Sequence, residues 1–155
     1  MKVAVIADTH GKYDHLIEPL KELDLSYIIH LGDFVEDGKI LSELTNIPLI
    51  IVKGNNDYLA YTEPEELYTT IEGKSFFISH GHRLGVYRGL NMLLINAKEH
   101  GSDVVLFGHT HMYHEEMIDN ILVLNPGSAS YARGGDKESI AILDLDTLEV
   151  QKIEF

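Results

Sequence analysis

The chain contains no cysteine, and this absence narrows the chemistry open to it. Without cysteine there can be no disulfide, no thiolate metal site and no cysteine nucleophile. Any metal ion must therefore be bound by His, Asp, Glu, Asn, backbone oxygen or water. The 155 residues fit one compact domain that can bury most of its apolar surface, so the fold does not depend on disulfides.

Basic side chains are also scarce. The 12 Lys and Arg residues stand against 25 Asp and Glu residues, and the formal net charge is -13. A field of this sign repels polyanions at long range, which argues against a general nucleic-acid binder.

Long apolar runs are missing as well. No stretch approaches the roughly 18 to 20 residues that span a bilayer. The first ten residues are broken by Asp8 and His10, unlike a signal peptide. We therefore expect a cytoplasmic protein with no membrane segment, and the sequence leaves a homo-oligomer open.

No repeat, low-complexity tract or flexible linker divides the sequence, so we expect one domain over residues 1–155. In the first half, short apolar runs alternate with segments of helical periodicity. The expected strands are 3–7, 27–31 and 48–52, and the expected helices are 14–23, capped by Asp14, and 37–44. Two such strand–helix–strand units predict a parallel sheet.

The second half reads as mostly antiparallel. We expect a hairpin of 67–72 with 75–79 around Gly73-Lys74, a helix over 90–100, a buried strand over 104–107, and antiparallel pairs of 113–118 with 121–124 and 139–144 with 148–155. Mixed strands with few helices predict two packed sheets with the helices outside.

Five of the expected strands run directly into residues that can bind metal ions. The segments are Asp8-Thr9-His10, Gly32-Asp33, Gly54-Asn55-Asn56-Asp57, His80-Gly81-His82 and Gly108-His109-Thr110-His111. The carboxyl ends of parallel strands lie along one sheet edge, so these segments should meet there. One residue separates Asp8 from His10, and one separates His109 from His111. An extended backbone would point both side chains of each pair the same way.

Carboxylate, imidazole and amide ligands together suit divalent Mn, Fe, Co, Ni or Zn. Seven such side chains exceed the needs of one ion, whereas two ions that share a bridging carboxylate would use them all. Paired metals about 3.5–4 Å apart are a known device for phosphoryl transfer.

The ordered set D-T-H, G-D, G-N-N-D, S-H-G-H and G-H-T-H, from about Val3 to Gly127, resembles the calcineurin-like metallophosphoesterase family. It is most similar to the small single-domain prokaryotic phosphodiesterases. The resemblance implies a mixed α/β fold, a four-layer α-β-β-α sandwich. It also implies that small phosphate esters, phosphodiesters first, are hydrolysed by a hydroxide that bridges two metal ions.

By resemblance, one ion would be bound by Asp8, His10, Asp33 and His111, and the other by Asp33, Asn55, His80 and His109. Asp33 would bridge them. Manganese is the first expectation for the metal, with Ni, Co, Fe and Zn as alternatives.

Two departures from the family pattern bear on catalysis. Much of the family has a His that contacts the leaving group where this chain has Asn56, and an amide cannot deliver a proton at neutral pH. Asp57 is kept and is expected to orient Asn56 or a ligand, and His82 is the candidate to supply the missing proton. Asp37 stands where related protein phosphatases carry a phosphate-binding Arg, which argues against phosphoprotein substrates.

Two other functions remain open at this point. A retromer subunit resembles this fold but has a degraded metal site and acts as a protein-binding scaffold, whereas all seven ligand positions are intact here. A nuclease of the same superfamily would carry extra domains and basic surfaces, which this short acidic chain lacks. Outside the ligand set, we expect His30 to be packed or solvated and residues 125–128 to form a structural turn.

Overall fold

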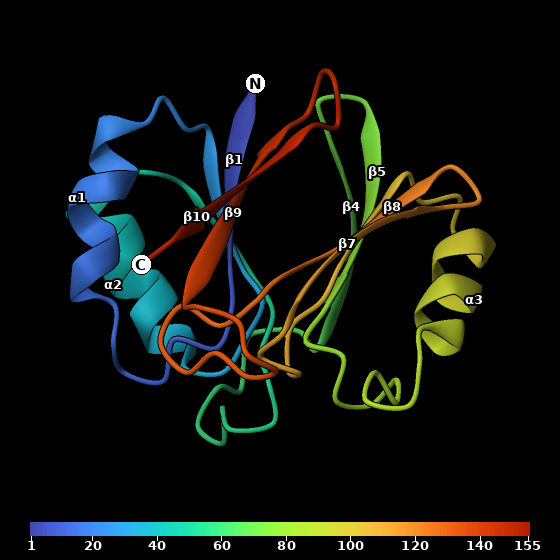
Figure 1. The fold of residues 1–155 in the computed structure, drawn as a ribbon, viewed down its shortest axis with the longest axis horizontal. Coiled ribbons are helices and arrows are strands. Elements are labelled where there is room, and N and C mark those ends of the chain that lie inside the picture. Colours follow the sequence, from blue (N-terminus) through green and yellow to red (C-terminus); the bar gives the residue numbers. More distant parts are fainter.

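The computed structural model describes residues 1–155 as two five-stranded sheets packed against each other, with helices on both outer faces (Figure 1). The three helices are α1 (Asp14–Glu22), α2 (Val35–Thr45) and α3 (Asn91–Glu99). None of them has the length and apolar character needed to cross a membrane.

The first sheet has the strand order β10-β9-β1-β2-β3. Its strands are β1 (Lys2–Ile6), β2 (Tyr27–His30), β3 (Leu49–Ile51), β9 (Ser139–Asp144) and β10 (Val150–Glu154). Strands β1, β2 and β3 are parallel, as the two strand–helix–strand units predict. Strand β9 pairs antiparallel with β1 on its other side, with Val5 opposite Ala141.

The second sheet has the order β4-β5-β6-β8-β7. Its strands are β4 (Glu66–Ile71), β5 (Lys74–Ser79), β6 (Val104–Leu106), β7 (Tyr113–Ile118) and β8 (Ile121–Pro126). Both hairpins of this sheet are confirmed, but the first turns at Glu72 and Gly73, which have positive φ, rather than at Gly73-Lys74. Strand β6 lies parallel to both β5 and β8.

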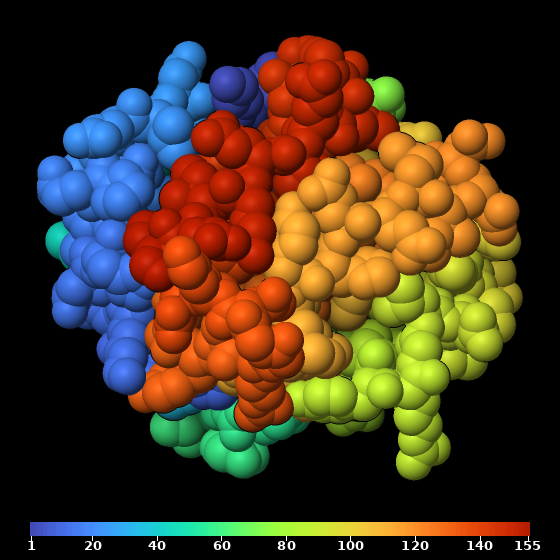
Figure 2. Space-filling model, in the orientation of Figure 1, coloured from blue at the N-terminus to red at the C-terminus, as the bar shows by residue number.

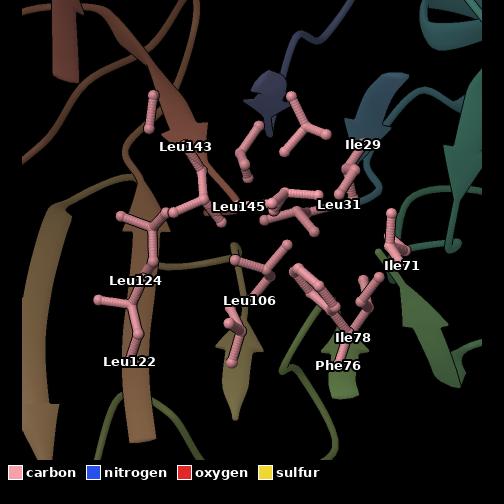
Figure 3. Packing of buried hydrophobic residues seen from close by; sticks show 14 of the residues in the cluster. Ile29, Leu31, Ile71, Phe76, Ile78, Leu106, Leu122, Leu124, Leu143 and Leu145 are labelled. Atoms are coloured by element: carbon pink, nitrogen blue, oxygen red, sulfur yellow. The ribbon is translucent and has the colours of Figure 1, made fainter. Parts of the chain in front are cut away.

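The main hydrophobic core lies between the two sheets. Leu31 and Leu143 from the first sheet pack with Leu106 and Leu124 from the second (Figure 3). A second cluster joins α1 and α2 to the first sheet, and a third joins α3 to the second sheet. The four-layer α-β-β-α sandwich is thus confirmed.

Two helix starts differ from the expectation. Asp14 is the first residue of α1 rather than its cap, and Tyr13 at the cap position makes no side-chain bond there. Helix α2 starts at Val35, two residues early, because the carboxylate of Asp57 accepts the N–H groups of Phe34 and Val35. A distant loop therefore supplies the cap that the local sequence lacks.

His30 is completely buried at the end of β2, so of the two environments expected for it, packed or solvated, the structure shows the packed one. The N–H of Gly32 donates to its Nδ1 (3.3 Å), so Nε2 carries the proton and donates to Thr9 Oγ1 (3.1 Å). A Cβ on Gly38 of α2 would lie only 3.0 Å from the His30 ring, which explains a glycine inside this helix. Burial lowers the pKa of His30 to about 4.

This burial predicts a pH-dependent loss of stability. The folded pKa lies below the ordinary value near 6.5, so the stabilisation is complete above pH 6.5 and declines as the pH falls toward 4. Lowering this pKa from 6.5 to about 4 corresponds to about 3 kcal/mol. Urea unfolding of metal-free protein at pH 7 and pH 4.5 measures the loss. Between pH 7 and pH 4.5, the free energy of unfolding of His30→Asn should fall by about 3 kcal/mol less than that of the native protein. An equal fall in both proteins would show that His30 does not cause this pH dependence.

Candidate metal centre

The loops that follow β1, β2, β3, β5 and β6 meet at one edge of the sandwich, at the bottom of Figure 1. Three of these strands belong to the first sheet and two to the second, so the site lies where two sheets meet rather than along one sheet edge. All seven predicted ligand side chains are brought together at this point.

The first group of ligands surrounds the carboxylate of Asp8. Ligand atoms of Asp8, His10, Asp33 and His111 all lie within 4.8 Å of one another. Nε2 of His111 is 3.4 Å from Asp8 Oδ1, and Nε2 of His10 is 3.4 Å from Asp33 Oδ2. These four side chains are the set expected for one ion.

The second group surrounds His80. Its Nε2 lies 3.0 Å from Asn55 Oδ1, 3.2 Å from His109 Nδ1 and 3.5 Å from Asp33 Oδ1. Asp8 and His80 are fully buried, whereas Asn55 is exposed and His10 and His109 are half-buried. The open side of the centre is therefore formed by Asn55, His10 and His109.

The protons on two of the imidazoles are fixed by backbone carbonyls. His80 Nδ1 donates to Leu31 O (2.8 Å), and His111 Nδ1 donates to Tyr131 O (2.7 Å). In the neutral rings, both Nε2 atoms then present lone pairs to carboxylate and amide oxygens. The buried Oδ1 of Asp8 has no hydrogen-bond donor. A group of hydrogen-bond acceptors with so few donors is suited to bind cations. The hydrogen bonds from Nδ1 of His80 and His111 to backbone carbonyls are of the kind that orients metal-bound histidines.

The charge states suit this role. Burial, helped by the nearby His80, lowers the pKa of His109 to about 4, so the ring is neutral at pH 7. Burial raises the pKa of Asp33, but His80 and the hydrogen bonds from Asn56 outweigh it and the net pKa is lowered. His111 is the exception: burial lowers its pKa, but the bond and charge of Asp8 outweigh this and raise it, so a metal ion bound there would have to displace a proton from His111.

The backbone at the site is not extended, so the extended geometry expected for the pairs Asp8/His10 and His109/His111 is wrong. Five ligand residues adopt positive φ angles: Asp8 (53°), His10 (46°), Asp33 (57°), His109 (70°) and His111 (59°). Each costs about 1–2 kcal/mol for a residue with a side chain. The ligands converge because tight turns at the strand ends aim them inward.

Glycines allow two of the ligand loops to touch. A Cβ on Gly32 would lie 2.5 Å from the backbone nitrogen of Gly54, and a Cβ on Gly54 would collide with the carboxylate of Asp33. Gly32 also has a positive φ of 94°. The turns after β2 and β3 can thus approach closely enough for Asn55 and Asp33 to reach the same space.

Asp57 holds the loop of Asp33 in place. Its Oδ2 accepts the N–H groups of Asp33 (2.9 Å) and Gly54 (2.7 Å), and its Oδ1 accepts those of Phe34 and Val35 (2.8 Å each). It therefore orients a ligand, which is one of the two expected roles, through the backbone of that ligand.

Asn56 contacts the proposed bridging ligand. Its backbone N–H donates to Asp33 Oδ1 (3.0 Å) and its side-chain amide donates to Asp33 Oδ2 (2.7 Å). His82, the third candidate, is half-buried with its ring 5.4 Å from that of His80, and its Nδ1 has no partner. Burial lowers the pKa of His82, so it is neutral at pH 7. Catalytic roles for both residues remain predictions.

Several bracing residues were not foreseen from the sequence. Ser128 Oγ donates to Asp8 O (2.8 Å), and Ser130 Oγ donates to the carbonyls of Asp8 and Thr9. Asn125 donates to Gly108 O (3.0 Å), but it belongs to β8, which extends to Pro126, so only Gly127 and Ser128 of the turn expected over residues 125–128 lie beyond the strand. The only signal in the sequence is a run of small polar residues after β8.

Comparison with known proteins gives a family match over most of the chain. Residues 1–148 match the model of the calcineurin-like phosphoesterase superfamily domain. A probable metallophosphoesterase of Bacillus subtilis is 35% identical over 94% of this chain and 85% of its own length. A phosphodiesterase of Methanocaldococcus jannaschii is 34% identical over 99% of this chain and 98% of its own length.

Solved structures agree with these matches. A structure described as a novel archaeal phosphodiesterase covers all of both chains, with 31% identity and a TM-score of 0.80. Vps29 of Entamoeba histolytica has a TM-score of 0.81 over 99% of both chains but only 19% identity. That likeness establishes the fold alone.

The contacts of Asp57 predict that its loss will weaken the metal centre at a distance. Asp57→Ala leaves four backbone N–H groups without their acceptor, so unfolding should become easier by roughly 3 kcal/mol. Metal affinity should fall about 10- to 100-fold, as for other residues that orient ligands. Urea unfolding and calorimetric metal titration measure the two effects.

Asp103→Ala is the matched control, because Asp103 accepts one N–H, that of Ser75, at the opposite end of β5. It should lower stability and leave metal affinity unchanged. Equal metal affinities for Asp57→Ala and the native protein would show that the loop of Asp33 does not depend on Asp57.

Proposed function

The chain belongs to the calcineurin-like phosphoesterase superfamily, and on this basis we propose that it hydrolyses small phosphodiesters with two divalent metal ions bound at the sheet edge. The proposal assigns Asp8, His10, Asp33 and His111 to one ion, and Asp33, Asn55, His80 and His109 to the other. Manganese is the proposed metal, with Ni, Co, Fe and Zn as alternatives.

The position of Asp33 is the observation that carries this proposal. Its Oδ2 faces His10 at 3.4 Å and its Oδ1 faces His80 at 3.5 Å, so one carboxylate reaches both groups of ligands. A single ion could not use seven side chains spread on both sides of this carboxylate. The arrangement supports Asp33 as the bridge between two ions.

The residues of the chain prepare the site for a phosphate ester. When bound, two divalent ions lower the pKa of a water molecule and neutralise charge on the phosphoryl oxygens. Asp8 and Asp33 are the buried carboxylates of the site, and the four imidazoles and the amide of Asn55 complete the ligand set. The exposed side at His10, Asn55 and His109 leaves room for a phosphate group to approach.

Other functions of the superfamily fit less well. A scaffold does not require seven intact ligands with fixed imidazole protons. A nuclease that binds long polyanions is disfavoured by the net charge of -13. Asp37, in place of a phosphate-binding Arg, is buried and accepts the N–H of Gly11 at 2.7 Å, which gives it a structural role. We therefore do not propose phosphoprotein substrates.

Metal dependence is the test of this function. Removal of metal with a chelator should reduce hydrolysis of bis(4-nitrophenyl) phosphate by at least about a hundredfold, because the ions contribute several kcal/mol to transition-state stabilisation. Added Mn²⁺ should restore activity, and calorimetric titration should find two ions per chain. Full activity in stripped protein would refute the proposal, and preferred cleavage of single-stranded DNA would favour a nuclease.

Asn56 generates a further prediction. We propose that position 56 faces the leaving group, so the native protein should hydrolyse aryl esters well and alkyl esters poorly. Asn56→His should raise rates more for alkyl than for aryl leaving groups, since general-acid help is worth roughly 10²- to 10⁴-fold. A plot of log kcat/KM against leaving-group pKa for both proteins measures the effect.

Metal loading must be matched in this comparison, because Asn56→His also removes the hydrogen bond to Asp33 Oδ2. Equal slopes at equal metal content would show that position 56 acts only by holding Asp33.

A further inference from the structure

An apolar pocket lies directly beside the metal centre, on the side of Asp33 and His10. Its volume is about 260 Å³, and its apolar walls are Phe34, Val35, Tyr58, Leu59 and Ala60. The segment near residue 60 forms the loop at the lower edge of the molecule in Figures 1 and 2.

The pocket and the metal centre share residues. Asn56 lines the pocket and donates to Asp33 Oδ2 at 2.7 Å. The ring of Phe34 lies 5.2 Å from that of His10. A phosphate held at the metal centre would therefore place one of its ester groups at the mouth of this pocket.

The aromatic wall of the pocket is formed by Phe34, whose backbone conformation is strained. Phe34 has a φ of 74° and is 40% exposed, although a bulky residue rarely adopts this backbone conformation. Asp57 binds the N–H of Phe34 and also that of Asp33, so one carboxylate positions both the ring and the ligand. Strain of this kind is concentrated at functional sites.

The charge of the pocket excludes a second phosphate. Its only charged residues are Glu36 and Asp57, and both oxygens of Asp57 are already occupied by backbone N–H groups. No Lys or Arg lines it. Its volume is below the roughly 300–1,000 Å³ of sites for drug-sized molecules, so it suits a single ring system.

We propose that this pocket binds an uncharged aromatic or similarly apolar ester group that stays on phosphorus, beside the leaving group that Asn56 faces at the pocket edge, and that the natural substrates are phosphodiesters carrying such a group. This inference rests on the proposed phosphodiesterase function and adds a substrate class to it. Phe34 and Leu59 are the residues that set the preference.

The test compares two diesters that release the same 4-nitrophenolate, 4-nitrophenyl phenyl phosphate and 4-nitrophenyl methyl phosphate. The native protein with Mn²⁺ should favour the phenyl ester in kcat/KM by roughly ten- to a hundredfold, as expected for burial of one ring. Calorimetry, which does not depend on turnover, should show phenylphosphonate binding more tightly than methylphosphonate by a similar factor.

Variants separate the pocket from its surroundings. Leu59→Ser and Phe34→Ala should each reduce the phenyl preference several-fold in both measurements. Tyr61→Ser is the matched control, since Tyr61 is as exposed as Leu59 (82% each) and belongs to the same loop but does not line the pocket. It should keep the native preference.

The outcomes distinguish the two proposals. If neither diester is hydrolysed in a metal-dependent way, the phosphodiesterase function itself is wrong. If both are hydrolysed at similar rates and the two phosphonates bind equally, the pocket proposal alone is overturned. An equal loss of preference in Leu59→Ser and Tyr61→Ser would also overturn it, because the effect would then belong to the loop as a whole.

Discussion

The burial of two neighbouring carboxylates, Asp8 and Asp33, is the constraint on which the rest of the structure depends. Their exposed fractions are 0% and 2%, and a charge removed from water is costly unless it is paired. Asp8 Oδ2 receives the N–H of His109 at 3.0 Å, but its Oδ1 receives no donor. Nδ1 of His80 and Nδ1 of His111 each face a backbone carbonyl, so the metal ions that the family match implies would balance this buried charge.

The loops around these carboxylates are held by hydrogen bonds from distant segments. Five of the predicted ligand residues hold a left-handed backbone that a free chain would avoid. Asp57 binds the turn of Asp33, while Ser128 and Ser130 bind the carbonyl of Asp8.

The sequence predicts the fold well because each element carries its own signal. The buried strands are short apolar runs, the helices have helical periodicity, and the seven ligands follow strand ends in a recognisable order. What the sequence does not predict depends on contacts between distant segments. The start of α2 is determined by Asp57, the buried role of Asp37 depends on Gly11, and the bracing by Ser130 needs the whole fold. Positive φ at residues such as His10 has no local signature, because glycine is absent there.

The position of β1 has a consequence for how the chain is made. Its two neighbours in the sheet are β2, which follows closely, and β9, which comes near the end of the sequence. During synthesis one side of β1 must stay unpaired until residues 139–144 leave the ribosome, and open strand edges favour aggregation. The bracing serines also lie late, between β8 and β9. Asp8 is therefore made long before the serines that complete its environment, and one edge of β1 stays open while all the segments between β1 and β9 are synthesised.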